Sequence, residues 1–150
     1  MTDTWPDHKE THMSASSREN TLTVAPDSGL NEALVRGFQV RLQAELKNLS
    51  HEDQALRQQL ASDEVATEHA VVDGAEGALS VEANLEVITQ IQHERQEMDA
   101  IQAALDRIAA GEYGLCTECG APIGQPRLDI VPEASHCIDC QEAAERHPGH

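Results

Sequence analysis

Aromatic side chains are scarce in this chain of 150 residues. Trp5, Phe38 and Tyr113 are its only aromatic residues and make up 2% of the sequence. Because aromatic side chains usually supply a large share of a buried core, the sequence argues against a thick globular core. Alanine, leucine, glutamine and glutamate are plentiful instead, a composition typical of long helices. An elongated, mainly helical protein is therefore predicted.

Basic residues are also few. Lysine and arginine total 10 against 27 aspartates and glutamates, which gives a formal net charge of −17. Nucleic-acid binding needs lysine and arginine to displace counterions from phosphates, and the sequence has no basic cluster. The charge balance argues against direct binding to DNA, RNA or an anionic membrane, and it favours a basic protein surface as the partner.

Long apolar runs are missing as well. No run approaches the roughly 20 residues of a membrane span, and the first residues lack the basic and apolar regions of a secretory signal. These absences predict a cytoplasmic protein, in whose reducing surroundings paired CxxC motifs indicate metal more often than a disulfide. No nucleophile–base set is apparent, so an enzyme is not expected.

The first part of the chain is polar. Residues 1–29 are rich in Ser, Thr, Asp, Glu and His and contain Pro6 and Pro26. Too little apolar surface is present to offset the entropy of ordering them, so a disordered leader is predicted. Asp27 or Ser28 is a candidate cap for a helix that begins near Leu30.

Two apolar rows at helical spacing follow the leader. The first covers residues 30–60 and the second residues 79–110, and each repeats every seven residues, as in a coiled coil. Between them, Gly74 and Gly77 each weaken a helix by about 1 kcal/mol relative to Ala. The matched rows predict an antiparallel hairpin over residues 30–110 with its tip near 63–78; two helices of an ordinary bundle are the alternative. The rows consist of Val35, Leu42, Leu49 and Leu56 with Leu46 and Leu60, and of Ile91, Met98 and Leu105 with Val87, Ile101 and Ile108.

Gly111 predicts the end of the second helix, and a four-cysteine motif follows it. Cys116, Cys119, Cys137 and Cys140 form C-x2-C-x17-C-x2-C. Two residues between cysteines allow both sulfurs of a pair to face one ion, and the spacer lets the second pair complete a tetrahedron. With four cysteine ligands no position stays open for water or substrate, so one structural Zn2+ is predicted.

Other uses of four cysteines are less well supported. A redox CxxC usually occurs singly within a βαβ pattern, which is absent, whereas a rubredoxin-like iron site is not excluded by the spacing. His136 adjoins Cys137 and is an alternative ligand, although four thiolates suffice. DNA readers of the GATA type share a similar spacer but need basic residues, and between Cys116 and Cys140 the only lysine or arginine is Arg127.

The segment from Gly111 to Gln141 reads G-E-Y-G-L-C-T-E-C-G-x-x-I-x-x-x-R-L-x-x-x-P-x-x-x-x-C-I-D-C-Q. It closely resembles the DksA/TraR family of bacterial transcription regulators. The match includes more than the cysteines, and the preceding hairpin is similar to that of the longer, DksA-like members. The resemblance covers residues 30–146. The matching residues other than cysteine include Tyr113, Gly114, Ile123, Arg127, Leu128 and Pro132.

The resemblance implies a function. Members of the family bind RNA polymerase and not DNA, and their hairpin enters the secondary channel, where its tip changes the stability of promoter complexes. The family's tip motif is D-x-x-D-x-A, and here Asp73, Glu76 and Ala78 occupy its three positions. An acidic tip suits a channel lined by basic residues that leads to catalytic magnesium. From charge alone, these acids would be interpreted as solvated loop residues.

The resemblance gives little support for a response to the alarmone ppGpp. Family members that respond hold its phosphates with basic residues, and at the corresponding places this chain has Ala100, Val131 and Gln141. Arg127 remains, but one arginine is a poor clamp for so charged an anion.

Together these features predict a monomeric, mainly α protein, an antiparallel coiled-coil hairpin with a small C-terminal four-cysteine zinc-finger lobe. Residues 111–146 are expected to form the zinc finger with a terminal helix, and residues 147–150 a tail. The predicted function is direct regulation of RNA polymerase. The alternative is a zinc-finger coiled-coil adaptor that binds another protein.

Overall fold

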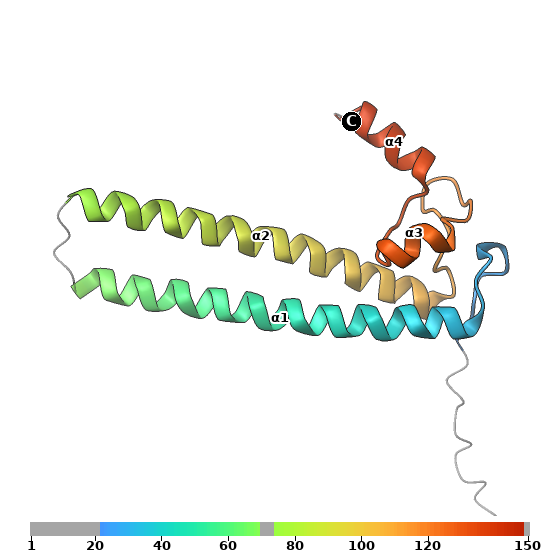
Figure 1. Ribbon diagram of the computed structural model, residues 1–150, viewed down its shortest axis with the longest axis horizontal. Coiled ribbons are helices and arrows are strands. Elements are labelled where there is room, and N and C mark those ends of the chain that lie inside the picture. Colours follow the sequence, from blue (N-terminus) through green and yellow to red (C-terminus); the bar gives the residue numbers. More distant parts are fainter. Residues whose placement is uncertain (1–21, 70–73, 149–150) are drawn as a thin grey trace, which may run out of the picture.

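Two long antiparallel helices with a small lobe at one end make up the protein (Figure 1). The computed structural model describes residues 22–69 and 74–148, and the side chains of residues 64–80 are not described. No strand forms within these described ranges, where Leu115 and Pro122 make one isolated antiparallel bridge. The predicted mainly α hairpin with a C-terminal lobe is thus confirmed. Its elements are the 3-10 turn η1 (Pro26–Ser28) and the helices α1 (Glu32–His69), α2 (Gly74–Ala110), α3 (Gln125–Ile130) and α4 (Ile138–Arg146).

The apolar rows of α1 and α2 face each other along the hairpin. Leu42 and Ile101 are fully buried between the helices near the lobe, and Ile108 is almost so. Farther from the lobe the contact opens, and Val81 and Leu85 are exposed. Burial is therefore deepest where the lobe adds a further layer, as expected for a narrow seam that lacks other partners.

The two helices of the hairpin are longer than the apolar rows predicted. Helix α1 has 38 residues and α2 has 37, which corresponds to arms of about 55 Å at about 1.5 Å per residue. Gly74 and Gly77 lie within α2 rather than in a loop. In proteins most helical stability comes from tertiary packing rather than from propensity, so packing along the rest of the hairpin offsets the penalty of about 1 kcal/mol for each glycine. The predicted tip near 63–78 is thereby shortened.

Part of the predicted leader is ordered. Ala25 and Ser28 are buried, and the Ser28 hydroxyl donates a hydrogen bond to the Ala25 carbonyl at 2.6 Å. Asn31 caps α1 instead of Asp27 or Ser28, since its Oδ1 accepts a hydrogen bond from the Leu34 N–H at 2.8 Å. The expectation of disorder over residues 1–29 is wrong for residues 22–29, because their few apolar side chains find a preformed surface on the lobe. Residues 1–21 lie outside the described part.

Two glycines shape the junction of hairpin and lobe. At Gly111, with φ of 73°, α2 ends as predicted, and the N–H groups of Gly111 and Glu112 donate to the carbonyls of Ile108 and Arg107. Gly114, with φ of 90°, lies against the N-terminal segment, and a Cβ there would be 2.7 Å from Leu30 Cδ1. The chain therefore needs glycine at Gly114 both for its backbone conformation and for its close approach to Leu30.

Replacing Gly114 by alanine is expected to lower the free energy of unfolding by about 1–3 kcal/mol, because it strains the backbone and displaces Leu30. Urea unfolding followed by circular dichroism would measure the change. Gly37→Ala is the control, since a Cβ at this α1 position meets nothing within 4 Å and should stabilise the helix by about 0.5–1 kcal/mol. Equal stability of Gly114→Ala and the parent would contradict the packing described here.

Candidate metal centre

The first cysteine pair lies on a tight turn. Cys116 is buried and Cys119 exposed. The Gly120 N–H donates to the Cys116 carbonyl at 2.9 Å, while the Cys116 N–H donates to the Ala121 carbonyl at 2.7 Å. Gly120 has φ of 73°, a conformation that glycine adopts without strain. The turn thus brings both sulfurs to one side, as the x2 spacing predicted.

The second cysteine pair opens the last helix. Cys137 precedes α4 in an extended conformation, and Cys140 lies in the first turn of that helix. The Gln141 N–H donates to the Cys137 carbonyl at 3.0 Å. Helix N-termini carry partial positive charge, which favours thiolates at these positions. The Thr117 N–H also donates to the Ser135 carbonyl at 2.9 Å and so links the two pairs.

The four sulfurs fit a tetrahedral metal. Those of Cys116, Cys119, Cys137 and Cys140 all lie within 4.8 Å of one another, and the sulfurs of Cys119 and Cys137 are 3.7 Å apart. Zinc–sulfur bonds of about 2.3 Å place tetrahedral sulfurs roughly 3.8 Å apart. A disulfide would need about 2.05 Å, and all four cysteines are free. The geometry matches one closed four-thiolate site.

Electrostatics at the site also favour a bound cation. Burial of the Cys116 thiol acts to raise its pKa, but hydrogen bonds from backbone N–H groups, those of Cys119 and Cys137 foremost, lower the pKa to about 6. The neighbouring thiols, with Cys137 first, raise the pKa of Cys140. Once the first thiolate forms, the next is therefore harder to form. A divalent metal removes this conflict, because it binds all four sulfurs as thiolates.

Three side chains hold the loop that leads to the second cysteine pair. Two of them are arginines: Arg107 donates to the carbonyls of Glu133 and Ala134, both at 3.3 Å, and Arg127 Nε donates to the His136 carbonyl at 3.1 Å. The third is Tyr113. The positioning role of Arg107 was not predicted from the sequence, because a basic residue in the last turn of a helix is common and gives no distinguishing signal. The contact of Arg127 with the loop was not predicted either, although the sequence identified Arg127 as a residue of the family motif.

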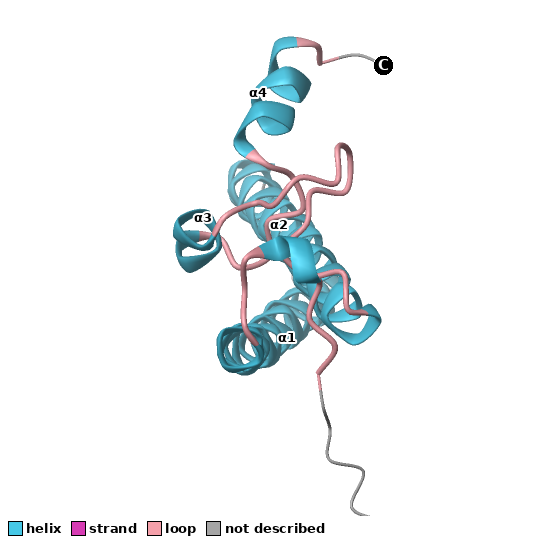
Figure 2. Cartoon of the chain, turned by 90° about the vertical axis from the view of Figure 1, so that its right-hand side faces the viewer, coloured by secondary structure: helices cyan, strands magenta, loops and turns pink. Residues whose placement is uncertain are grey.

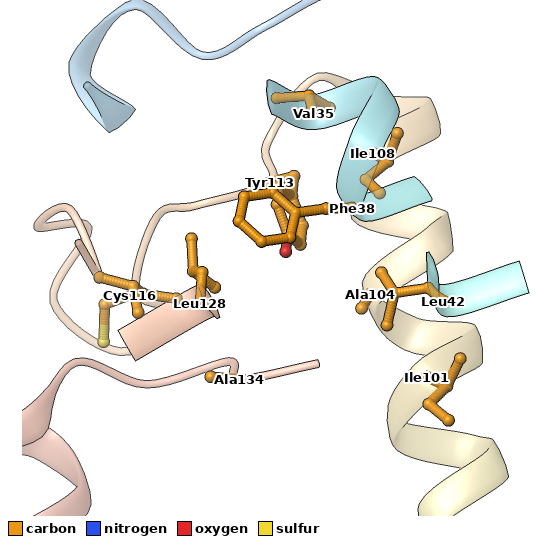
Figure 3. Close-up of a cluster of buried hydrophobic side chains, with 11 residues drawn as sticks. Val35, Phe38, Leu42, Ile101, Ala104, Ile108, Tyr113, Cys116, Leu128 and Ala134 are labelled. Carbon is orange, nitrogen blue, oxygen red and sulfur yellow. The ribbon is translucent and has the colours of Figure 1, made fainter. Parts of the chain in front are cut away.

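Tyr113 joins the loop to the hairpin. Its hydroxyl donates to the Pro132 carbonyl at 2.8 Å, and burial raises the pKa of Tyr113, so the phenol stays protonated and able to donate. Its ring packs on Phe38 of α1 with 5.8 Å between ring centroids. Figure 3 shows the two rings between the hairpin residues and Leu128 of the lobe. The two rings thus connect the metal-binding lobe to the coiled coil.

The ring nitrogens of His136 lie close to side chains other than the four cysteines. Its Nδ1 is 2.8 Å from the Ser135 hydroxyl, and its Nε2 is 3.8 Å from a carboxylate oxygen of Glu118. It is not part of the metal-ligating group found among the described residues. The four cysteines are therefore the better ligand set, in agreement with the closed-site argument.

Helix α4 extends away from the hairpin, as the end-on view shows (Figure 2). It contains no buried residue, and Ile138 is exposed. The helix is fixed to the protein at its N-terminus, where Cys137 and Cys140 lie. Its orientation therefore depends on the metal site.

Known proteins match this chain in its sequence and its fold. The model of the prokaryotic dksA/traR C4-type zinc finger matches residues 111–146. The RNA polymerase-binding transcription factor DksA of Escherichia coli is 33% identical over 117 residues, which cover 77% of this chain and 74% of that protein. The chain belongs to the DksA/TraR family.

Other members show how the likeness is distributed. The RNA polymerase-binding transcription factor DksA of Haemophilus influenzae is 42% identical, but over 52 residues that cover 35% of this chain and 36% of that protein. The solved structure of transcription factor DksA2 from Pseudomonas aeruginosa superimposes with a TM-score of 0.66 at 32% identity, covering 78% of this chain and 89% of that one. The hairpin and lobe are thus an arrangement that DksA2 shares.

Family membership and the sulfur geometry together give the chain one structural zinc. The other predicted site residues are Asp73, Glu76 and Ala78. Asp73 lies outside the described residues, and Glu76 and Ala78 are backbone positions of α2, whose side chains are not described. Of the positions that the resemblance relates to alarmone binding, Arg127 Nε donates to the His136 carbonyl, and the Gln141 side chain donates to Glu145 at 2.8 Å.

Among the helices of residues 22–69 and 74–148, none combines the length and the apolar character that crossing a membrane requires.

Proposed function

We propose that this protein is a non-catalytic transcription regulator that binds RNA polymerase directly and inserts its hairpin into the secondary channel. The observation that carries the proposal is the joint match of hairpin and lobe to DksA proteins, one of which is 33% identical over 74% of its length and is named for RNA polymerase binding. A stiff pair of antiparallel helices that is fixed at its base suits insertion into a narrow channel. The proposed location is the cytoplasm, where the polymerase works.

In this proposal the metal has a structural role. Cys116, Cys119, Cys137 and Cys140 are its ligands, and zinc stabilises a lobe that has few buried apolar residues of its own. With four thiolates in place, no coordination position remains for substrate. The lobe orients the hairpin and offers α4 as a second contact surface.

The tip would carry the regulatory effect. Asp73, Glu76 and Ala78 stand at the positions of the family's D-x-x-D-x-A motif, and we assign them the modulation of promoter complexes. Glu76 is one methylene longer than aspartate, so its carboxylate reaches farther. In support of this assignment, the last residues of α1 and the first residues of α2 lie at the end of the molecule opposite the lobe (Figure 1).

The proposal includes no direct binding to DNA and no strong binding of ppGpp. The net charge of −17 repels phosphates. Arg127 is the one basic residue left at the alarmone positions, and its Nε donates to the His136 carbonyl. A regulator that acts through protein contacts alone agrees with both features.

Pull-down with core RNA polymerase tests this function. The zinc-loaded chain should bind the polymerase at micromolar or lower concentrations and should not shift duplex DNA alone under the same salt conditions. Bound complexes should show altered promoter-complex lifetimes. Salt-sensitive DNA binding without polymerase would contradict the charge argument. Absence of polymerase binding would overturn the proposal in favour of an adaptor for another protein.

A further inference from the structure

A groove on the hairpin lies far from the metal site. It has a volume of about 650 Å3 and runs beside the contact of α1 and α2, where the seam opens away from the lobe. Its walls combine apolar and acidic side chains from both helices. Its lining includes Leu49 and Glu52 from α1, and Leu85, Glu86, His93, Glu94 and Glu97 from α2.

Glu94 is the unusual member of this lining. It stands in the apolar row of α2, seven residues after Val87 and seven before Ile101, and is only 5% exposed. Its Oε1 accepts a hydrogen bond from the Gln90 side chain at 3.0 Å. Its Oε2 is buried and has no hydrogen-bond partner among the described residues. A buried carboxylate oxygen without a partner is destabilising, so Glu94 lowers the stability of the hairpin when no partner is bound.

The groove is also one-sided in charge. Four carboxylates line it, and no lysine or arginine does. The one basic side chain of the lining is His93, whose Nδ1 is 3.9 Å from Glu97. The nearby Arg95 is directed at Asp53 of α1 instead, at 4.0 Å. A cation from outside the chain would thus meet attraction from several directions.

The acidic oxygens are too widely spread for a single small ion. Among the described residues, the cysteine cluster is the one set of ligand atoms close enough to hold a metal. A guanidinium is larger and planar, is less strongly hydrated than an ammonium, and donates several hydrogen bonds at once. Leu49 and Leu85 provide an apolar surface for the methylene stem of such a side chain.

We propose that this groove binds an arginine side chain of a partner protein, with Glu94 as the buried acceptor. The inference rests on the proposed function in one respect, since it takes RNA polymerase as that partner. A second copy of this chain is a poor occupant, because both copies carry a net charge of −17. Exposed Leu85 (57%) and Ile88 (41%) lie on the same segment of α2 and would be covered by the partner surface around the arginine.

Two substitutions separate binding from stability. Glu94→Gln keeps the shape and can still accept from Gln90, but it removes the charge, so affinity for core RNA polymerase should fall about tenfold or more. Glu94→Leu completes the apolar row and should raise the thermal midpoint of the free protein while weakening polymerase binding. Glu82→Gln is the control, because this exposed α2 residue does not line the groove and should bind as the parent does.

A second experiment uses peptides to test the groove without polymerase. A short helical peptide with one arginine between leucines is compared with the same peptide carrying neutral citrulline. Amide shifts in the parent protein should map to Leu85–Glu97 for the arginine peptide, and Glu94→Gln should abolish the difference between the peptides. If the parent fails to bind polymerase yet shows this difference, the proposed function fails and the groove chemistry stands.

Several outcomes would overturn the inference. One is polymerase binding that is unchanged in Glu94→Gln. Another is equal binding of the arginine and citrulline peptides. A third is that Mg2+ or Ca2+ alone produces the same amide shifts, which would make the groove an inorganic cation site.

Discussion

Replacement of Cys119 by serine is expected to release the zinc and to unfold the lobe beyond Gly111, while the hairpin keeps most of its helicity. A structural zinc contributes on the order of 10 kcal/mol to folding. The lobe has no comparable reserve, since α3 has 6 residues and α4 buries none. Metal analysis and circular dichroism of protein prepared under reducing conditions would measure both effects.

A neighbouring substitution provides the control for this experiment. Glu118→Gln changes an exposed residue between the first two cysteines and should leave one zinc per chain and the parent helicity. Chelation of zinc from the parent should reproduce the serine variant. Parent protein without stoichiometric zinc, or a serine variant whose lobe stays folded without metal, would contradict the assignment.

Neutralising the tip is expected to abolish regulation without abolishing binding. The double variant Asp73→Asn with Glu76→Gln removes both acids of the predicted tip motif. We expect both side chains to be exposed, and exposed substitutions usually change stability by no more than about 0.5 kcal/mol. Most of the contact area with the polymerase should come from the hairpin sides and the lobe. Polymerase affinity should therefore stay near that of the parent, while the effect on promoter-complex lifetime or transcript output is lost.

Glu76→Asp is the matched control for the tip. It keeps the charge and restores the shorter acid of the family motif, so activity should be retained or increased. If the doubly neutral variant regulates transcription as well as the parent, the two acids are solvated residues and the adaptor function becomes the better hypothesis. Loss of polymerase binding in the double variant would instead show that the tip contributes to affinity.

The periodic parts of the fold could be predicted from the sequence. The heptad rows of α1 and α2 identified the helices that pack together, because spacing alone decides which side chains share a face. The predicted helix boundaries near the tip were wrong, because a helix continues through Gly74 and Gly77 only when packing in the hairpin stabilises it. The prediction of disorder for residues 22–29 was wrong for a related reason. Ala25 and Ser28 are buried only when the lobe has folded.

The metal site, like the fold, could be predicted only in part from the sequence. The spacing of the cysteines predicted the cluster, since two-residue gaps restrict where sulfurs can point. The side chains that hold its loop could not be found this way. Arg107 lies 26 residues before Glu133, whose carbonyl it binds, and no local pattern reports such a contact. Glu94 was likewise hidden, because a single acid in a heptad row does not reveal whether its oxygens find partners.

The close packing at the base of the hairpin has a mechanical consequence. With arms of about 55 Å, a tilt of about 5° at the base moves the far end by roughly 5 Å, at about 1.5 Å of rise per residue. The base is held at several points, by the ring contact of Phe38 and Tyr113, by Arg41 on the Asp129 carbonyl, and by Leu30 against Gly114. These contacts act as the clamp of a cantilever. The position of the far end of the hairpin therefore depends on the rigidity of the contacts at its base.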